Sequence, residues 1–298
     1  MSQSSWLTEF PQLDRSQLAQ MRKFLDGAYL DFSRAYGESI ENFFHPLQSL
    51  LIGFEKLLLA TPWWLVLIVL AGLAYAASRS IKLVLGVLCA FVFIGVFGMW
   101  EDTMRTMTII IVATLLAIGI GIPLGILMAS SDRCERIGKP ILDVMQTMPA
   151  FVYLIPVVML LGIGKIPGLL AVITYAIAPV IRLTNLGIRL VDKEVLEAAT
   201  AYGANPRQRL FGVQIPLAMP TIMAGINQTI MMALSMVVVA SMIGVKGLGQ
   251  PVLKSITNQY FTLGLLNGLA IVVLAIVFDR LTQAYAKRSQ QHLGQGHS

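Results

Sequence analysis

The chain is organised around a polar stretch that reads EAATAYGANPRQRLFGVQIP from Glu197 to Pro216. Strongly apolar segments lie on both sides of it, and its length exceeds what a turn between two helices requires. Residues that favour and residues that break a helix also follow one another in a definite order. We interpret this stretch as the part of the chain that meets another protein, and the apolar remainder as the part that it moves.

The first half of the stretch predicts a short helix. Three acids come before or at its start, where the positive end of a helix favours negative charge: Asp192, Glu194 and Glu197. Ala198 and Ala199 give a narrow face that another surface can approach closely. Gly203 is placed to end this helix, because glycine adopts the left-handed conformation that often follows a helix end.

The second half predicts a turn and another short helix. Asn205 and Pro206 impose the turn, and a short helix would then carry Arg207, Arg209, Leu210 and Phe211. Pro216 would start the next apolar segment. The residues alone leave two interpretations open: the stretch docks on a partner, or it is a surface helix that only closes a loop.

The composition of the chain is that of a membrane protein. Of 298 residues, 56% are hydrophobic and 13% are charged, with a mean hydropathy of +0.73; a soluble domain carries roughly 25% charged residues. The net charge of +6 comes from bases in loops beside apolar runs, which fits membrane orientation better than nucleic-acid binding. Cys89 and Cys134 have neither the surroundings nor the spacing of a disulfide or a metal site.

Seven apolar segments are long enough to be considered as membrane spans, since a bilayer core needs about 20 helical residues. They are residues 61–77, 83–100, 106–129, 145–163, 167–187, 218–243 and 262–280. Trp63-Trp64 opens the first and Trp100 closes the second, as interface anchors do. The glycines at 119, 121 and 125 predict close helix packing with a kink, or a gating bend. The connection from Ser130 to Asp143 is charged, and a polar tail begins at Gln283.

Residues 1–60 predict amphipathic helices that do not span. One apolar stripe runs from Leu18 to Ala35 and a second from Ile40 to Leu58, at alternating steps of three and four residues. We expect a break after Gly37, with Pro46 as a kink or a start. Such helices pack on the outside of a bundle or lie at the membrane surface.

Charged residues in the short loops predict the orientation, because Lys and Arg accumulate on the cytoplasmic side. Twelve lie on one side: Arg79, Lys82, Arg133, Arg136, Lys139, Arg189, Lys193, Arg207, Arg209, Arg280, Lys287 and Arg288. Four lie on the other: Arg105, Lys165, Lys246 and Lys254. The polar stretch and the C-terminus are therefore expected in the cytoplasm, and seven spans then place the N-terminus outside.

The polar stretch resembles the EAA signature of ABC importer permeases. Glu197-Ala198-Ala199 is followed by Gly203 after three residues and by Val213 to Pro216 after nine more. Val and Ile stand where Ile and Leu are commonest, which keeps the apolar character. The resemblance implies a type I permease bundle whose helix docks in a cleft of an ATP-binding subunit. It also implies coupling contacts for these residues: Glu197, Ala198, Ala199, Gly203, Pro206, Arg207 and Pro216.

Three further stretches are similar to the permease subunits of glycine betaine/proline betaine uptake systems. They are DVMQTMPAFVYLIP from Asp143, PLAMPTIMAGINQT from Pro216, and ALSMVVVASMI from Ala233 with Gly247-Leu248-Gly249 after it. The likeness covers most of residues 60–285. It implies a bacterial inner-membrane protein that works as a homodimer with two ATPases and an external substrate-binding protein. Betaine, choline and carnitine are equally compatible with it.

A substrate with a methylated ammonium head would meet aromatic faces and soft methionines. The candidate translocation path is Met148, Phe151, Tyr153, Asn227, Gln228, Met231 and Ser235. The alternative for each is packing, or, for serine, a bond to its own helix. Asn227 and Gln228 stand out because amides inside a span need a partner, but they are equally able to hold two helices together.

Two absences from the sequence restrict how transport could be driven: ionisable residues inside the spans and a phosphate-binding loop. No Asp, Glu or His falls in the middle of a predicted span, and Asp279 lies close to a span end; ion-coupled carriers place ionisable groups at mid-membrane. No phosphate loop G-x-x-x-x-G-K-[ST] is present. The chain is therefore expected to be a non-catalytic subunit without cofactor or metal, with ATP and Mg bound by a partner.

The predicted organisation has four parts. They are an N-terminal amphipathic segment (1–60), two peripheral spans (61–100), a permease core (101–285) with a cytoplasmic coupling segment (192–216), and a cytoplasmic tail (286–298). Two other functions remain open at this point: an ATP-independent facilitator or secondary carrier of small polar solutes, and a membrane scaffold that recruits a soluble protein.

Overall fold

The computed structural model describes residues 13–294 of the chain. These residues form helices and turns and no strand, so the predicted all-α fold is confirmed. The chain divides into two compact units, Met1–Pro46 and Leu47–Ser298, which are described separately.

Helix α2 (Arg15–Ala60) is one continuous helix of 46 residues that begins in the first unit and ends in the second. The predicted break after Gly37 is wrong. A glycine inside a helix costs only about 1 kcal/mol relative to alanine, and the helix also continues through Pro46. None of residues 13–46 is buried, and members of the apolar stripes in this part of α2 such as Met21 and Phe43 are exposed.

Four helical segments of the described residues are long and apolar enough to cross a membrane. They are α5 (Trp100–Ser130), α8 (Lys165–Arg189), the continuous run Pro206–Ile243, and Phe261–Arg288 of α13 (Phe261–Gly294). The number rises to six when each of two bent helix pairs is counted as one span. The four segments coincide with the predicted spans 106–129, 167–187, 218–243 and 262–280.

The two predicted peripheral spans are short helices. Trp63 opens α3 (Trp63–Ser78), and α4 (Ile81–Val96) follows; each has 16 residues. Trp100 does not close the second span but begins α5, because the chain turns at Gly98 with a positive φ of 74°. A backbone turn of this kind favours glycine and ends the preceding helix.

The predicted span 145–163 is interrupted. The charged connection before it forms the helix α6 (Asp132–Thr147), and α7 (Ala150–Leu161) follows at an angle of 98°. The break falls at Met148, whose ψ of 132° is extended. A residue before proline is disfavoured in the helical region, and Pro149 comes next, so the sequence itself contains the cause of the bend.

The C-terminal helix is longer than predicted. α13 continues through the expected polar tail to Gly294, because that tail is rich in residues with high helix propensity such as Ala, Gln, Lys and Arg. Residues 295–298 of the tail lie outside the described part of the chain.

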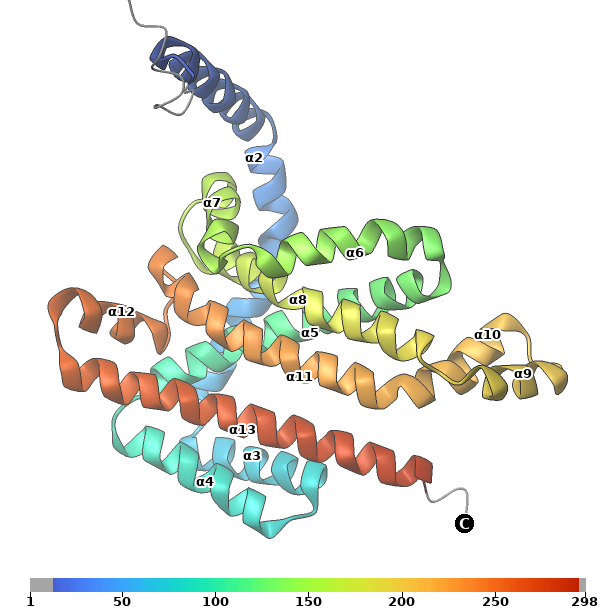
Figure 1. Cartoon of the computed structure of the whole chain (residues 1–298). Helices are drawn as coiled ribbons and strands as arrows, with labels where there is room; N and C mark the ends of the chain where they lie inside the picture. Colours follow the sequence, from blue (N-terminus) through green and yellow to red (C-terminus); the bar gives the residue numbers. More distant parts are fainter. Residues whose placement is uncertain (1–12, 295–298) are drawn as a thin grey trace, which may run out of the picture. The chain divides into compact units, whose positions relative to one another are not determined.

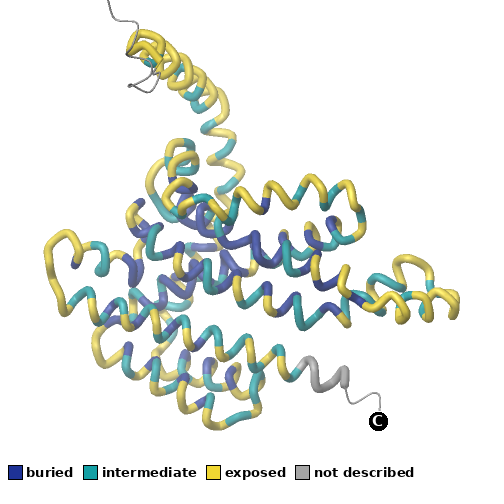
Figure 2. Tube along the Cα trace, in the orientation of Figure 1, coloured by how far each residue is buried: buried dark blue, intermediate teal, exposed yellow. Residues whose placement is uncertain are grey.

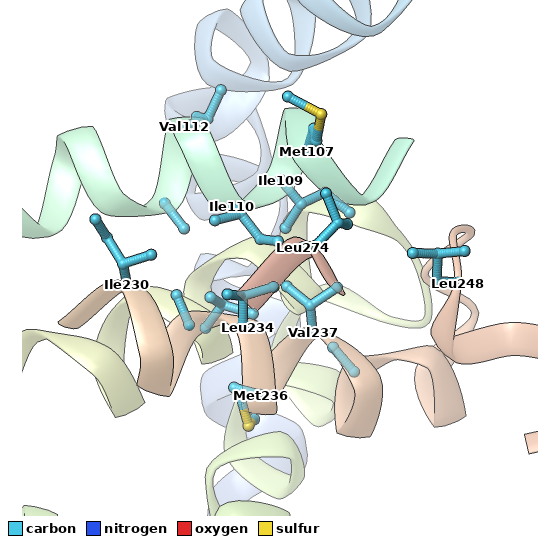
Figure 3. Close-up of a cluster of buried hydrophobic side chains, with 14 of the residues drawn as sticks. Met107, Ile109, Ile110, Val112, Ile230, Leu234, Met236, Val237, Leu248 and Leu274 are labelled. Carbon is cyan, nitrogen blue, oxygen red and sulfur yellow. The ribbon is translucent and has the colours of Figure 1, made fainter. Parts of the chain in front are cut away.

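The core of the second unit is built on α8. Its contacts with α11 (Ile215–Ala240) and with α5 are more extensive than those of any other pair of helices among the described residues. Figure 3 shows apolar side chains of this core, with Ile109 and Ile110 of α5 on the side of α5 that faces Leu234 and Val237 of α11. In Figure 2 the buried residues concentrate along these three helices.

The close approach of α5 and α8 depends on glycine. A Cβ at Gly125 would lie 2.6 Å from the Thr184 Cβ and 2.8 Å from the Ile181 carbonyl oxygen. Of the two interpretations of the α5 glycines, the structure therefore supports close helix packing at this position.

Candidate functional site

The segment of residues 192–216, here called the docking segment, joins α8 to α11. It contains α9 (Lys193–Ala201), α10 (Pro206–Arg209) and a π-turn η1 (Leu210–Gln214). Figure 1 shows α9 and α10 beyond the ends of α8 and α11. Its two short helices and the turn between them occur where the sequence predicts them.

Helix α9 is closed at both ends by its own residues. At its start, the Asp192 carboxylate accepts a hydrogen bond from the Glu194 N–H at 3.0 Å. At its end, the Ala204 N–H donates to the Ala199 carbonyl at 3.0 Å and the Gly203 N–H donates to the Thr200 carbonyl at 2.9 Å. This pair of bonds is a Schellman motif, and Gly203 supplies its left-handed residue with φ 84°.

Helix α10 begins with a complete capping box. The Asn205 side chain accepts from the Gln208 N–H at 2.8 Å, and the Gln208 side chain accepts from the Asn205 N–H at 2.9 Å. Pro206 occupies the first helical turn, where its missing N–H costs nothing. The turn between α9 and α10 is therefore specified by local hydrogen bonds.

Pro216 lies in the first turn of α11, close to where the sequence predicts a helix start, but no break precedes it, since the helical run is continuous from Pro206 to Ile243. The wider π-turn η1 ends just before this proline, with the Ile215 N–H donating to the Leu210 carbonyl. A proline inside a helix clashes with the carbonyl four residues earlier, and a wider turn at that place accommodates the ring.

The docking segment is attached to the bundle by a small apolar cluster. Leu196, Leu210 and Ile215 pack against four buried residues of α8, α11 and the connection between α8 and α9: Ile188, Val191, Ala218 and Ile222. The Arg209 guanidinium also donates to the Thr200 hydroxyl at 3.3 Å, which links α10 to α9. One face of the segment is thereby fixed, and the other is free.

The free face carries most of the predicted coupling residues. Five are exposed: Glu197, Ala198, Gly203, Pro206 and Arg207. Ala199 and Pro216 are partly buried. Tyr202 is 94% exposed and Phe211 is 63% exposed, so the segment also carries two uncovered aromatic side chains.

A polar cluster holds α6 against α8 immediately before the docking segment. Arg189 donates to Asp132 at 2.7 Å and to the Met128 carbonyl at 3.0 Å, and it lies 3.3 Å from Glu135. Glu135 also accepts from Lys139 and Asn185. These two hydrogen bonds, Lys139 first, lower the pKa of the Glu135 carboxyl against the effect of burial, so this carboxylate stays ionised at neutral pH.

The candidate path residues at the bend from α6 into α7 do not share one environment. Tyr153 is buried, its hydroxyl donates to the Met145 carbonyl, and its ring centroid lies 5.6 Å from that of Tyr175. Phe151 is 53% exposed and Met148 is partly buried. Tyr153 therefore braces the bend between α6 and α7, and Phe151 presents a free aromatic face.

Asn227 and Gln228 point to different sides of α11. The Asn227 amide donates to the Asp279 carboxylate at 2.9 Å and accepts from the Thr282 hydroxyl, which ties α11 to α13. Gln228 is exposed. It shares one helix face with Met231 and Ser235, three and seven residues further on, and the Ser235 hydroxyl bonds its own helix at the Met231 carbonyl.

The structure reveals polar groups that sequence reasoning did not single out. Glu55 of α2 is buried and accepts from Lys165 at 2.6 Å, with Arg105 3.9 Å away. An acid within the apolar stripe between Phe54 and Leu58 was the available signal. Asp279, which the sequence places close to a span end, lies inside α13 and accepts a hydrogen bond from Asn227, since α13 continues for fifteen residues beyond it.

Among the described residues, no group of three or more His, Cys, Asp or Glu side chains is arranged to hold a metal ion. The docking segment offers a surface and not a reaction centre: an exposed acid, small residues and aromatic side chains on a rigidly capped turn. This arrangement is suited to contact with another macromolecule.

The family described as "Binding-protein-dependent transport system inner membrane component" matches residues 121–291. The chain is 50% identical over 245 residues to the glycine betaine/proline betaine transport system permease protein of Escherichia coli (strain K12), covering 82% of this chain and 69% of that protein. It is 44% identical to the glycine betaine/carnitine transport permease protein of Listeria monocytogenes, covering 84% of this chain and 91% of the relative.

A solved structure has the same fold. An inward-facing form of the MetNI methionine ABC transporter aligns with a TM-score of 0.57 at 18% identity, covering 62% of this chain and 93% of the solved chain. The predicted all-α importer-permease bundle is thus present in a multi-pass membrane protein.

Proposed function

Because the chain belongs to the family of binding-protein-dependent transport system inner membrane components, we propose that it is the permease subunit of an ATP-driven importer of quaternary ammonium compounds. Relatives are named for glycine betaine with proline betaine or carnitine, for choline, and for carnitine. Glycine betaine is the substrate we assign first, since the relatives of highest identity share it in their names.

The observation that supports this function most directly is the docking segment. A short helix that is capped at both ends, attached on one side and exposed on the other is built to transmit force from a partner to α8 and α11. Glu197 would contact the partner, Ala198 and Ala199 would allow close approach, and Gly203 would end the helix. Pro206, Arg207 and Pro216 would position the second half of the segment.

The partner of the docking segment is an ATP-binding subunit that carries ATP and Mg. Two copies of this chain would pair, each with one ATPase, and an external substrate-binding protein would deliver the substrate. ATP binding must favour one orientation of the paired bundles over the other, because a ligand without differential affinity shifts no equilibrium.

The path between the two copies would use the side of each bundle that the single chain leaves exposed. Gln228, Met231 and Ser235 on one face of α11, with Phe151 and Met148 at α7, supply amide, thioether and aromatic contacts for a methylated ammonium head. Asn227 and Tyr153 act as positioning residues, because their polar groups are bonded within the chain.

The orientation follows the charge distribution of the loops. The docking segment and the C-terminus lie in the bacterial cytoplasm, and the N-terminus lies outside. Residues 1–60 and the helices within 61–100 are peripheral, the core is 101–285 with its coupling segment 192–216, and 286–298 end the chain on the cytoplasmic side.

The decisive experiment is reconstitution of the chain with its ATPase in proteoliposomes and measurement of glycine betaine uptake in the presence of the binding protein. Ala198→Trp adds bulk to the exposed face of α9 and should abolish ATP-dependent uptake and binding of the ATPase. Ile81→Trp, at an exposed position at the start of α4, is the matched control and should leave both intact.

An ATP-independent facilitator predicts the opposite result. Uptake that continues without ATP, or that is equal in the Ala198→Trp and Ile81→Trp proteins, rejects the importer. A panel of betaine, proline betaine, choline and carnitine against the binding protein by calorimetry then assigns the substrate.

A further inference from the structure

A basic pocket lies where α3 ends, α4 begins and the last turns of α13 pass. It has a volume of about 850 Å³ and is lined by four cationic residues: Arg79, Arg280, Lys287 and Arg288. Tyr75 and Ser78 add an aromatic ring and a hydroxyl. No acid belongs to its lining, so the pocket concentrates positive charge between three helices.

The positive charge of the pocket is poorly compensated within the described residues. Arg288 donates to the Ala76 carbonyl near the end of α3, and the Arg79 guanidinium lies 5.8 Å from the centroid of the Tyr75 ring. None of the four cations forms an ion pair with a described acid. Like charges that line one pocket repel one another, and an anion bound among them offsets that repulsion.

An apolar groove continues from the basic pocket between α4 and α13. The two share Ser80, Leu83 and Arg280, and the groove has a volume of about 640 Å³. Its lining includes Gly86 and Phe93 of α4 with Val273 and Ile276 of α13. A groove along α4 from Ser80 to Phe93 is about 20 Å long at 1.5 Å per residue, which exceeds the hydrocarbon depth of about 15 Å in one leaflet.

The polarity of these two cavities matches one class of ligand. A compact cluster of cations recognises a phosphate group, and an apolar groove that leads away from it accommodates a hydrocarbon chain. The loop between α3 and α4 and the last part of α13 belong to the side that is rich in Lys and Arg, which is cytoplasmic. Basic pockets between helices at that membrane surface bind anionic headgroups.

We propose that the basic pocket and the apolar groove together bind one anionic phospholipid of the cytoplasmic leaflet. Its phosphate lies among Arg79, Arg280 and Lys287, and one acyl chain lies against Gly86 and Phe93. The bound lipid holds α3 and α4 against α13, because its headgroup contacts all three helices. The assignment of a lipid rests on the two cavities and on the cytoplasmic placement of the loop between α3 and α4. It can be tested by lipid binding, without a transport assay.

The first test measures lipid binding to the purified, delipidated full chain by native mass spectrometry in non-ionic detergent. Phosphatidylglycerol should bind at least tenfold more tightly than phosphatidylcholine with the same chains. Arg79→Gln together with Arg280→Gln should lower phosphatidylglycerol affinity at least fivefold. The matched control, Arg133→Gln with Arg136→Gln, removes two exposed bases from α6 on the same side of the membrane and should change affinity less than twofold.

The second test separates a lipid from free phosphate. Inorganic phosphate at millimolar concentration should leave phosphatidylglycerol bound. Gly86→Leu places a side chain in the groove, where a Cβ meets no atom within 4 Å, and should weaken phosphatidylglycerol binding. Gly72→Leu in α3, where a Cβ also meets no atom within 4 Å, should not.

Three results would overturn the proposal: equal affinity for phosphatidylcholine, complete displacement by inorganic phosphate, or equal loss of binding in the α6 control. If the double variant unfolds, as judged by size exclusion, Lys287→Gln replaces it. The Lys287 side chain is exposed and takes part in no ion pair of the described residues, and its loss should weaken phosphatidylglycerol binding about twofold.

Discussion

The docking segment and the α5–α8–α11 core are stabilised in opposite ways. In the docking segment, nearly every polar contact joins residues within six positions of one another, as in the Asn205–Gln208 capping box and the turn at Gly203. In the core, the contacts join helices that are far apart in sequence, and they depend on small residues such as Gly125. The segment can therefore keep its shape although it is exposed, whereas the core keeps its shape only when all three helices pack together.

The contrast between local hydrogen bonds and long-range packing indicates which part of the molecule is rigid by itself and which depends on its neighbours. Under the proposed function, a segment with its own caps would follow the movement of a partner without deforming, and its apolar contacts with α8 and α11 would pass that movement to the core. The contacts between the core helices are mainly apolar, so the arrangement of these helices depends mainly on close packing. The two regions should consequently respond differently to the same kind of substitution.

The largest effect is expected at Gly125. Gly125→Val brings side-chain atoms onto the Ile181 carbonyl and Thr184 of α8, and overpacking of this kind costs about 1–3 kcal/mol. The thermal midpoint in detergent should fall by about 5 °C or more. Gly119→Val in the same helix is the control, since a Cβ there meets no atom within 4 Å. Equal midpoints for the two variants would contradict the close approach of α5 and α8.

A smaller effect, on transport and not on folding, is expected at Gly203. Its φ of 84° costs a residue with a side chain about 1–2 kcal/mol, so Gly203→Val should distort the end of α9. ATP-dependent uptake should fall about tenfold, the change that corresponds to about 1.4 kcal/mol, with an unchanged thermal midpoint. Gly212→Val, at a position where a Cβ meets no atom within 4 Å and φ is not positive, should retain uptake. If both variants transport equally, the turn is not required for coupling.

The same difference explains what the sequence predicts well. The caps and turns of the docking segment require particular residue types at short, fixed spacings. They can therefore be predicted from Gly203, Asn205 and Pro206. The ends of the longer helices follow less reliably from residue type. Pro149 does cause the bend at Met148, but Gly37 and Pro46, which are also helix breakers, do not interrupt α2. The hydrophobicity of the sequence shows where the apolar segments lie, but it does not show which of these segments pack against one another.

Polar residues inside the helices show this limit most clearly. Asn227 and Gln228 are adjacent and chemically similar, and both were candidates for the path. Only the packing of α13 against α11 brings the Asp279 carboxylate to Asn227. Glu55 likewise meets Lys165 across 110 positions of sequence. No spacing rule connects such pairs.

A third substitution compares these two amides. Asn227→Leu removes the hydrogen bonds to Asp279 and Thr282, and a bond between membrane helices contributes about 1 kcal/mol. The thermal midpoint should fall by about 2–4 °C. Gln228→Leu should leave the midpoint unchanged and reduce glycine betaine uptake. A fall in the midpoint for Gln228→Leu, or none for Asn227→Leu, would reverse the roles assigned to the two residues.

The smallest effect is expected within the docking segment itself, at its second cap. Asn205→Ala removes the side chain that accepts from the Gln208 N–H, and the loss of such a cap costs about 1 kcal/mol. Because this bond is local, the cost should remain local: amide hydrogen exchange in residues 205–209 should accelerate about fivefold, with no change in α8 or in the thermal midpoint. Arg207→Ala, in the same helix but without a capping bond, is the control. Faster exchange that spreads into α8 would show that the segment and the core unfold together, and the distinction between a locally capped segment and a packed core would then be wrong.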